Sequence, residues 1–340
     1  MNASPIETEA LVIGAGPVGL FAIFALGRVG MRCHVVDSLG EPGGQCMALY
    51  PEKPIYDIPA QPSILAADLV DRLLEQAKPF RPVFHLGQTA QTMEAGPKGG
   101  WRIATSAGTV FHAKTVIVAA GAGAFGPNRP PLADLESYEG RSVFYMVKRP
   151  ADLAGKKVVI AGGGDSAVDW AVLLAGLAAK VSVVHRRAKF RAAPDNIAKL
   201  ETLAQAGKVE LVIPYQLHAL EGADGRLDAV VVADLDGGTR RLEADTLLPF
   251  YGMAGDLGPI GQWGLALAEG RIEVDRASFA TNRPGIFAVG DIATYPGKLR
   301  LILSGFAEAT TAAHAAFAHA RPGQALHFEH STTAGLPPLA

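Results

Sequence analysis

Short apolar runs that end in glycine-rich turns and continue into longer apolar segments are the main pattern of the chain. The apolar run 10–13 leads into the glycines of 14–19, and residues 20–29 follow with the composition and length of a helix. Another apolar run, 32–36, comes next and ends at Asp37. This order of strand, glycine turn, helix and strand predicts a parallel βαβ unit.

The same order recurs in the middle of the chain. Its apolar run, glycine turn, helical segment and second run are residues 158–161, 162–167, 167–179 and 181–184. The number of positions from Gly16 to Asp37 equals the number from Gly164 to His185, the residues that follow the second apolar run of each unit. The sequence therefore predicts two dinucleotide-type units in the same register.

Two apolar runs outside these units also end in small residues. Residues 115–121 predict a buried strand, and a linker rich in glycine and proline follows at 122–131. Residues 286–291 predict another strand that ends in Gly-Asp, and residues 303–319 predict a helix of small residues.

The length of 340 residues is enough for about two domains. We therefore predict an α/β fold with two doubly wound dinucleotide-binding domains. The first domain is discontinuous and consists of residues 1–122 and 283–340. The second is inserted between them as residues 123–282.

Composition excludes several classes of protein. Hydrophobic residues make up 49% and charged residues 19%, which is the balance of a globular chain. The net charge is −2 and no basic run stands out, so no nucleic-acid partner is expected. No apolar stretch reaches the ~20 residues of a membrane span. The first residues lack the basic region of a secretory signal, and the two cysteines fit a reducing cytoplasm.

The first glycine turn has the residues of a dinucleotide site. Gly14 permits the tight turn, Gly16 lets the backbone approach a pyrophosphate, and Gly19 lets helix and strand pack closely. Asp37 is placed to accept hydrogen bonds from ribose hydroxyls. The alternative is that these glycines only shape a turn between strand and helix.

The second turn differs where its second strand ends. Gly162 and Gly164 repeat the glycine pattern, but the position that corresponds to the acid is occupied by His185, Arg186 and Arg187. An acid there repels the 2′-phosphate of NADPH, whereas guanidinium groups pair with it. We therefore predict that the second turn binds NADPH, and that nearby Arg191 helps Arg186 and Arg187 to bind the 2′-phosphate. The alternative is a solvated basic turn.

With these residues in place, the chain resembles the thioredoxin-reductase-like flavoproteins and, within them, the bacterial ferredoxin/flavodoxin–NADP reductases. The resemblance covers nearly the whole chain. Its narrower signals are the segments Ala-Leu-Tyr-Pro-Glu-Lys at 48–53 and His-Ser-Thr at 330–332. The shared signals are both glycine turns, residues 43–45, 55–57, 185–187 and 290–291.

The resemblance implies FAD at the first turn. Asp37 would hold its ribose, Gln45 and Tyr50 would contact the flavin, and the Tyr50 ring would stack on one face. The backbone of Ala90 would lie near the adenine, and Phe125 would lie close to the flavin. Ala90 and Phe125 have no support beyond the resemblance, and Tyr50 has the alternative of packing beneath the following proline.

The resemblance also assigns roles to the late segments. Asp291 would bind the ribityl or pyrophosphate portion of FAD, His330 would stack on the other flavin face, and Ser331 would bond near the ring. Their alternatives are a helix cap for Asp291 and an ordinary tail residue for His330. Ser166 would join the second glycine turn around NADPH. Family reductases are homodimers, so His330 is expected to reach either its own or a partner's flavin.

The cysteines decide the kind of electron acceptor. A thioredoxin reductase needs two neighbouring thiols, and this chain has only Cys33 and Cys46, without a C-x-x-C motif. Cys33 is predicted to be a core residue, and the reactivity of Cys46 stays open. Without a dithiol, the flavin must pass electrons directly to its acceptor.

We therefore predict a cytoplasmic, homodimeric ferredoxin (flavodoxin)–NADP+ reductase with FAD in the first domain and NADPH in the second. The alternatives are a related reductase with a quinone, oxygen or disulfide-protein acceptor, and a nucleotide sensor without turnover. No metal-ligand spacing is present, so no metal is expected. Lys298 and Arg300 are candidates for docking an acidic carrier.

Overall fold

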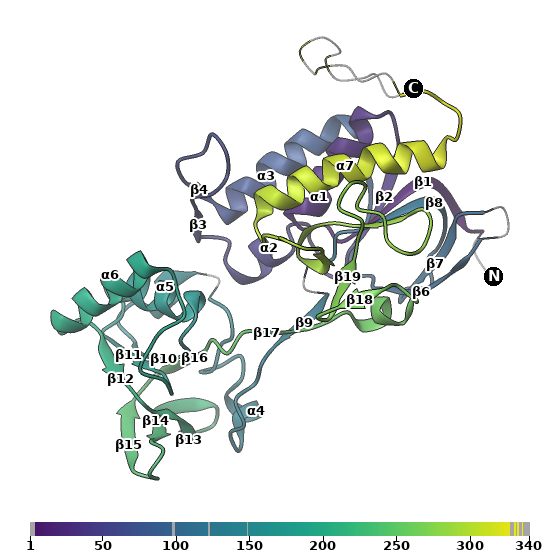
Figure 1. Ribbon diagram of the computed structural model, residues 1–340. Helices are drawn as coiled ribbons and strands as arrows, with labels where there is room; N and C mark the ends of the chain where they lie inside the picture. Colours follow the sequence, from purple (N-terminus) through teal and green to yellow (C-terminus); the bar gives the residue numbers. More distant parts are fainter. Residues whose placement is uncertain are drawn as a thin grey trace. The chain divides into compact units, whose positions relative to one another are not determined.

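The computed structural model describes residues 4–96, 99–121, 123–147 and 149–326, together with residues 330, 332 and 335. The chain divides into two compact units, Met1–Phe125 with Gly255–Ala340 and Gly126–Ala254 (Figure 1). Strands β9 (Ala124–Pro127) and β17 (Met253–Asp256) span the two boundaries and pair with each other. No helix in the described ranges is long and apolar enough to cross a membrane.

The first unit is organised around a mixed seven-stranded sheet with the order β5-β2-β1-β8-β7-β6, in which β20 also pairs with β8. Its parallel strands are β5 (Val83–His85), β2 (Cys33–Val36), β1 (Ile6–Ile13), β8 (Val110–Val118) and β20 (Ile286–Ala288). Its antiparallel strands are β7 (Trp101–Thr105) and β6 (Ala90–Ala95). Strand β20 comes from the end of the chain, so the first unit is discontinuous.

Three helices, α1 (Pro17–Arg28), α3 (Ala66–Ala77) and α7 (Ile302–Ala320), cover one face of this sheet (Figure 1). Pro17 occupies the first position of α1, where its fixed φ suits a helix start. Small residues on α7 let it pack against α1 and the sheet; they are Gly305, Ala309, Ala312, Ala313 and Ala316. The short elements on this side are α2 (Gln45–Leu49), β3 (Pro54–Ile55), β4 (Ile64–Leu65) and η1 (Lys78–Phe80).

The other face of the sheet is covered by the segment that follows β17. This segment holds η3 (Gly258–Gln262), β18 (Leu267–Ala268) and β19 (Arg271–Glu273). Strand β21 (Ala293–Thr294), which directly follows η4 (Gly290–Ile292), pairs with β19. Ile260, Trp263 and Ile272 are buried against Leu11 of β1 and Phe111 of β8.

The predicted domain boundary differs from this arrangement. Residues 255–282 were expected in the second domain, but they belong to the first unit. Their apolar side chains complete the core under the sheet, and the indole N–H of Trp263 donates to the Gln91 carbonyl at 3.1 Å. The inserted unit is therefore shorter than predicted.

The second unit has a parallel sheet of order β12-β11-β10-β16, formed by β12 (Glu210–Val212), β11 (Lys180–Val184), β10 (Lys157–Ala161) and β16 (Thr246–Pro249). Helices α5 (Asp165–Leu174) and α6 (Pro194–Gln205) pack on one face. An antiparallel sheet of β13 (Gln216–Ala223), β14 (Arg226–Ala233) and β15 (Thr239–Glu243) packs on the other. The short elements α4 (Leu135–Tyr138) and η2 (Pro150–Leu153) precede β10.

The predicted α/β class with two dinucleotide-binding-type units is confirmed. Both βαβ units form as predicted, because β1 pairs with β2 and β10 with β11 in parallel. In each unit, helices cover one face of the parallel sheet and strands cover much of the other.

Candidate nucleotide-binding sites

A cavity in the first unit crosses the carboxyl ends of four parallel strands. Its lining includes Gly14 after β1, Asp37 after β2, Ala119 at the end of β8 and Gly290 after β20. Ligands of open α/β sheets bind at this edge, outside the carboxyl ends of the strands. The cavity is therefore the candidate site for the first dinucleotide.

The first glycine turn leaves no room for larger residues. Gly14 has a φ of +103°, and a β-carbon at Gly19 would overlap the Gly14 carbonyl oxygen. A β-carbon at Gly44 would lie 2.9 Å from the Cα atom of Gly16, so two bare backbones form this part of the wall. Gly16 gives α1 no side-chain cap, which leaves first-turn N–H groups for a ligand. These features fit a pyrophosphate.

Asp37 is held firmly at the end of β2. Its side chain accepts hydrogen bonds from the backbone N–H groups of Ala15 at 2.5 Å and Leu39 at 2.8 Å. The residue is only 8% exposed, and burial raises the pKa of its carboxyl group while the two hydrogen bonds lower it. A carboxylate has about four lone-pair sites, so each oxygen retains capacity to accept a ribose hydroxyl.

The short helix α2 brings Gln45, Cys46 and Tyr50 to the cavity. The Cys46 Sγ atom lies 3.8 Å from the Tyr50 hydroxyl oxygen. Burial raises the pKa of the Cys46 thiol to about 11 and also raises the pKa of Tyr50. Burial raises the pKa of Cys33 to about 12. Both cysteines are therefore protonated thiols at neutral pH, which makes them poor nucleophiles.

The lining also includes Ala90 and Asp291, which the sequence analysis named, together with Leu257, Pro259 and Ile260. Leu257, Pro259 and Ile260 were not expected at this site, because their segment was predicted to belong to the second domain. The spacing of apolar residues 257, 260 and 263 was the available signal for a buried face.

Of the tail, the structure describes residues 330, 332 and 335, and none of them lines the cavity. His330 is exposed and is not part of the cavity lining. The carbonyl of Gly335 accepts a hydrogen bond from Arg28, at the end of α1 that lies away from the cavity. Ser331 and the side chain of Phe125 lie outside the described residues.

The second glycine turn is packed against the loop that follows β11. A β-carbon at Gly162 would lie 2.6 Å from the Phe250 carbonyl oxygen, and one at Gly163 would overlap the His185 ring. The Phe190 ring stacks on His185 at 5.3 Å between centroids. The Arg191 N–H donates to the Gly163 carbonyl at 2.6 Å. The turn and the basic loop therefore form one local structure.

Arg186, Arg187 and Arg191 form a cationic cluster around His185. All three are exposed, and within the described ranges none of them pairs with a carboxylate. Burial lowers the pKa of His185, and the positive charges of the three arginines lower it further. Ser166 is exposed in the first turn of α5, beside Gly164. This uncompensated charge fits a phosphate group.

One predicted docking residue is corrected by the structure. The Lys298 side chain is only 6% exposed and forms an ion pair with Glu308. It is therefore unavailable to a carrier protein. Arg300 is exposed and lines the cavity. Sequence alone did not show the partner of Lys298, because that partner lies on α7.

Comparison with known proteins agrees with the geometry. The model of the pyridine nucleotide-disulphide oxidoreductase family matches residues 8–320, and the chain belongs to this family. It is 61% identical to the ferredoxin–NADP reductase of Rhodospirillum rubrum over 339 residues, which is 99% of this chain and 98% of the relative. It is 62% identical to the ferredoxin–NADP reductase of Paramagnetospirillum magneticum, over 97% of this chain and 98% of that one.

Solved structures of the same fold are more distant in sequence. The thioredoxin reductase of Lactococcus lactis superimposes with a TM-score of 0.79 over 92% of this chain and 99% of its own, at 23% identity. The thioredoxin reductase of T. acidophilum has the same TM-score at 21% identity, over 92% of this chain and 98% of its own. These likenesses establish the thioredoxin-reductase-like fold.

Proposed function

We propose that the chain is a ferredoxin–NADP+ reductase that uses FAD to transfer electrons between NADPH and a one-electron carrier protein, ferredoxin or flavodoxin. The observation that carries the proposal is the contrast between two glycine turns in one chain. One turn faces a cavity with a buried acid, and the other adjoins three unpaired guanidinium groups. The names of the relatives at 61% and 62% identity support the same activity.

The first site is proposed to hold FAD. Gly14, Gly16 and Gly19 leave space for the pyrophosphate, and Asp37 accepts hydrogen bonds from the ribose. Its other contacts are assigned as in the sequence analysis, to Gln45, Tyr50, Ala90, Phe125, Asp291 and, from the tail, His330 and Ser331. The close approach of the Gly16 and Gly44 backbones at the cavity wall supports this assignment, because a β-carbon at Gly44 would lie only 2.9 Å from the Gly16 Cα atom.

The second site is proposed to hold NADPH. Gly162, Gly164 and Ser166 would contact its pyrophosphate, and the arginines that follow β11 would pair with its 2′-phosphate. His185 is kept largely neutral by burial and by the neighbouring charges, so it packs against the glycine turn without competing for the phosphate.

The residues of the chain have binding and shielding roles. Bound FAD supplies the redox chemistry, since a flavin accepts a hydride and releases electrons singly. Leu257, Ile260 and the buried Cys46 line the cavity with apolar surface and exclude water. Tyr50 stays protonated at neutral pH and provides a ring face with a hydroxyl donor.

The thiols support a direct acceptor. The chain has two cysteines, both buried, and burial raises the pKa of each thiol well above neutral pH. A dithiol relay requires a reactive thiolate beside a second thiol. We therefore favour a carrier that takes electrons straight from the flavin over a disulfide protein.

The first test is an absorption spectrum of the purified protein, followed by steady-state assays. Flavin bands, bleaching by NADPH without oxygen, and faster reduction of ferredoxin or flavodoxin than of quinone, oxygen or a disulfide protein are expected. A colourless protein that cannot be reconstituted with FAD contradicts the proposal. If NADPH bleaches the flavin bands but neither ferredoxin nor flavodoxin is reduced, the protein is a flavoprotein with another activity.

We also propose a cytoplasmic homodimer in which the tail serves the partner's site. The contact between Gly335 and Arg28 supports this, because α1 runs away from the cavity and spans about 18 Å at 1.5 Å per residue. A tail that is held there at Gly335 is better placed for a second copy than for its own cavity. Light scattering should give twice the mass of one chain, and a monomer at assay concentration would contradict the dimer.

A further inference from the structure

Glu308 is a buried carboxylate that none of the predicted roles uses. It lies in the second turn of α7 and is only 2% exposed. Its Oε2 atom accepts a hydrogen bond from the Gly290 backbone N–H at 2.7 Å, and its Oε1 atom accepts one from the Tyr295 hydroxyl at 2.8 Å. Lys298 forms an ion pair with the same oxygen. Such a buried charge is tolerated only when it is fully partnered.

The chain between η4 and α7 folds so that these partners meet. Residues 295–298 read Tyr-Pro-Gly-Lys, and the Lys298 N–H donates to the Tyr295 carbonyl at 3.1 Å. Gly297 has a φ of +79°, as the third position of a type II turn requires. The Lys298 Nζ atom lies 5.4 Å from the centre of the Tyr295 ring. This turn therefore presents a hydroxyl and an ammonium group together to Glu308.

Tyr295 stays a hydrogen-bond donor over the whole working range of pH. Burial and the neighbouring Glu308 carboxylate raise the pKa of its hydroxyl to about 12. Both oxygens of Glu308 thus keep donors, and the charge of Lys298 balances the carboxylate.

The Gly290 backbone, to which Glu308 is hydrogen-bonded, lies where η4, α7 and α1 are tightly packed against one another. Gly290 has a φ of +76°, and a β-carbon at Gly305 would lie 3.4 Å from the Gly290 Cα atom and overlap Val18 of α1. The next residue, Asp291, lines the cavity, and its carbonyl accepts a hydrogen bond from Arg271 Nε at 2.9 Å. A shift of Gly290 would therefore move Asp291 at the cavity wall.

We propose that Glu308 and Lys298 are a positioning pair that sets Gly290 and Asp291 against the start of α7. The pair thereby determines how tightly the cavity holds FAD and at what potential the bound FAD is reduced. This inference rests on the proposed function, because it needs FAD in the cavity. Neither residue lines the cavity. Glu308 acts through its hydrogen bond to the η4 backbone, and Lys298 acts through its positive charge, which the Glu308 carboxylate balances.

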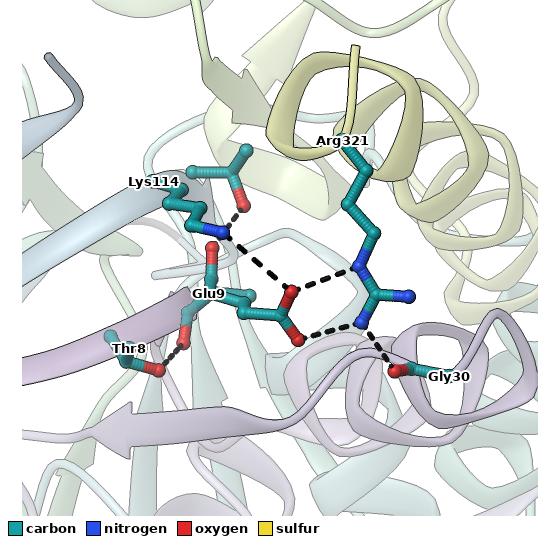
Figure 2. Close-up of polar contacts among 7 residues, drawn as sticks. Thr8, Glu9, Gly30, Lys114 and Arg321 are labelled. Atoms are coloured by element: carbon teal, nitrogen blue, oxygen red, sulfur yellow. Dashed lines mark hydrogen bonds and ion pairs between the residues drawn. The ribbon is translucent and has the colours of Figure 1, made fainter. Parts of the chain in front are cut away.

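The other end of α7 offers a matched control. Arg321 Nε and Nη2 pair with the two oxygens of Glu9 at 2.9 and 2.8 Å, and Nη2 also donates to the Gly30 carbonyl at 2.8 Å (Figure 2). Lys114 lies 3.9 Å from Glu9. This ion pair ties the same helix to the same unit, but none of its residues lines the cavity.

The experiment compares Glu308→Gln and Glu308→Asp with the control Glu9→Gln, in the FAD-loaded protein and after FAD removal. The measurements are the Kd for FAD from fluorescence quenching, the midpoint potential of bound FAD, and the Tm. Glu308→Asp keeps the charge but retracts it from Gly290, so the Kd is expected to rise about tenfold with little change in potential.

Glu308→Gln keeps an oxygen for Gly290 but leaves the charge of Lys298 unbalanced. A nearby positive charge favours the reduced, more negative flavin, so the ratio of reduced to oxidised FAD at a fixed potential should rise about tenfold. For two electrons this is an upward shift of about 30 mV. Lys298→Arg keeps the charge and is expected to stay near the wild-type potential.

Glu9→Gln is expected to lower the Tm while leaving the Kd and the potential within about twofold of wild type. If the Glu308 variants also lower only the Tm, the pair is merely structural and the inference is wrong. Should both Glu308 variants fail to fold, Tyr295→Phe removes one donor and is expected to raise the Kd about threefold; an unchanged Kd and potential in that variant overturns the inference. A wild-type protein that binds no FAD overturns the proposed function instead.

Discussion

The two glycine turns have the same spacing but opposite electrostatic surroundings. The first ends at Asp37, which is almost fully buried and held by two backbone N–H groups. The second ends at His185, surrounded by three exposed arginines. The same local backbone is thus present twice, and we propose that the residues that follow the second strand of each unit decide which nucleotide binds.

The surroundings also differ in enclosure. The first turn opens onto a cavity walled by apolar side chains from η3 and by α2 and η4. At the second turn, Ser166 and the arginines are all exposed. We interpret this contrast as the difference between a resident cofactor and an exchangeable one. Four changes probe the two units and their turns, from the largest expected effect to the smallest.

Gly19→Val should break the first site. The added β-carbon would overlap the Gly14 carbonyl oxygen, so the turn must open. We expect FAD affinity to fall at least about hundredfold, or about 3 kcal/mol, as measured by fluorescence quenching. Gly40→Ala is the control, since a β-carbon there meets nothing within 4 Å. Unchanged FAD binding in Gly19→Val would mean that FAD does not use this turn.

Arg186→Ala with Arg187→Ala should act only at the second site. We expect the KM for NADPH to rise about thirtyfold, or about 2 kcal/mol, because charge-assisted hydrogen bonds to the 2′-phosphate are lost. The KM for NADH should change less than about twofold. Lys208→Ala removes another exposed cation of the same unit and serves as the control. Equal effects on both nucleotides would show that the arginines do not read the 2′-phosphate.

His185→Gln should remove a pH dependence from the second site. The pKa of His185 lies below its ordinary value, so the ring is neutral at pH 7 and gains a proton only in acid. In the wild type, protonation adds positive charge beside the phosphate. The 2′-phosphate itself gains a proton at about pH 6 in both proteins, so the variant gives the baseline. We expect the KM for NADPH at pH 5, relative to pH 7, to be about threefold lower in the wild type than in the variant, and identical pH profiles in the two proteins would contradict the prediction.

A pair of histidines lies on the neighbouring strands β2 and β5 of the first unit. His34 Nδ1 and His85 Nε2 are 2.9 Å apart, and burial lowers the pKa of both rings. A lowered pKa in the folded state contributes stability that is present above the ordinary histidine pKa and is lost as the pH falls through the folded value.

His85→Gln should therefore flatten the loss of unfolding free energy between pH 7 and 5. Both rings are only partly buried, so the difference should stay below about 0.5 kcal/mol in urea titrations. His218→Gln alters an exposed ring of the other unit and should leave the profile unchanged. A steeper profile in His85→Gln would show that the pair is stabilised by protonation.

The sequence predicted what depends on local spacing. Each glycine turn lies in one βαβ unit, and Asp37 or the arginine cluster follows that unit's second strand directly, so a short stretch of chain contains both the turn and the residues proposed to bind the ligand. The two units and their parallel pairing followed from the same local order.

The features that the sequence did not predict depend on contacts between residues that are far apart in the sequence. Ile260 and Trp263 belong to the first unit because their partners, Leu11 and Phe111, are encoded much earlier. Lys298 looked like a surface cation because the sequence does not reveal its pairing with Glu308. Glu308 itself resembles any exposed acid on a helix until the structure shows its burial.

The split of the first unit between both ends of the chain has a consequence for synthesis. Strand β8 cannot pair with β20, nor can α7 cover the helical face, until the ribosome has completed the inserted unit and almost all of the rest. Until then the edge at Val116–Val118 remains open and apolar, which is a hazard for aggregation. A nascent chain stalled before Ile286 would therefore carry a finished second unit and an unfinished first one that depends on chaperones.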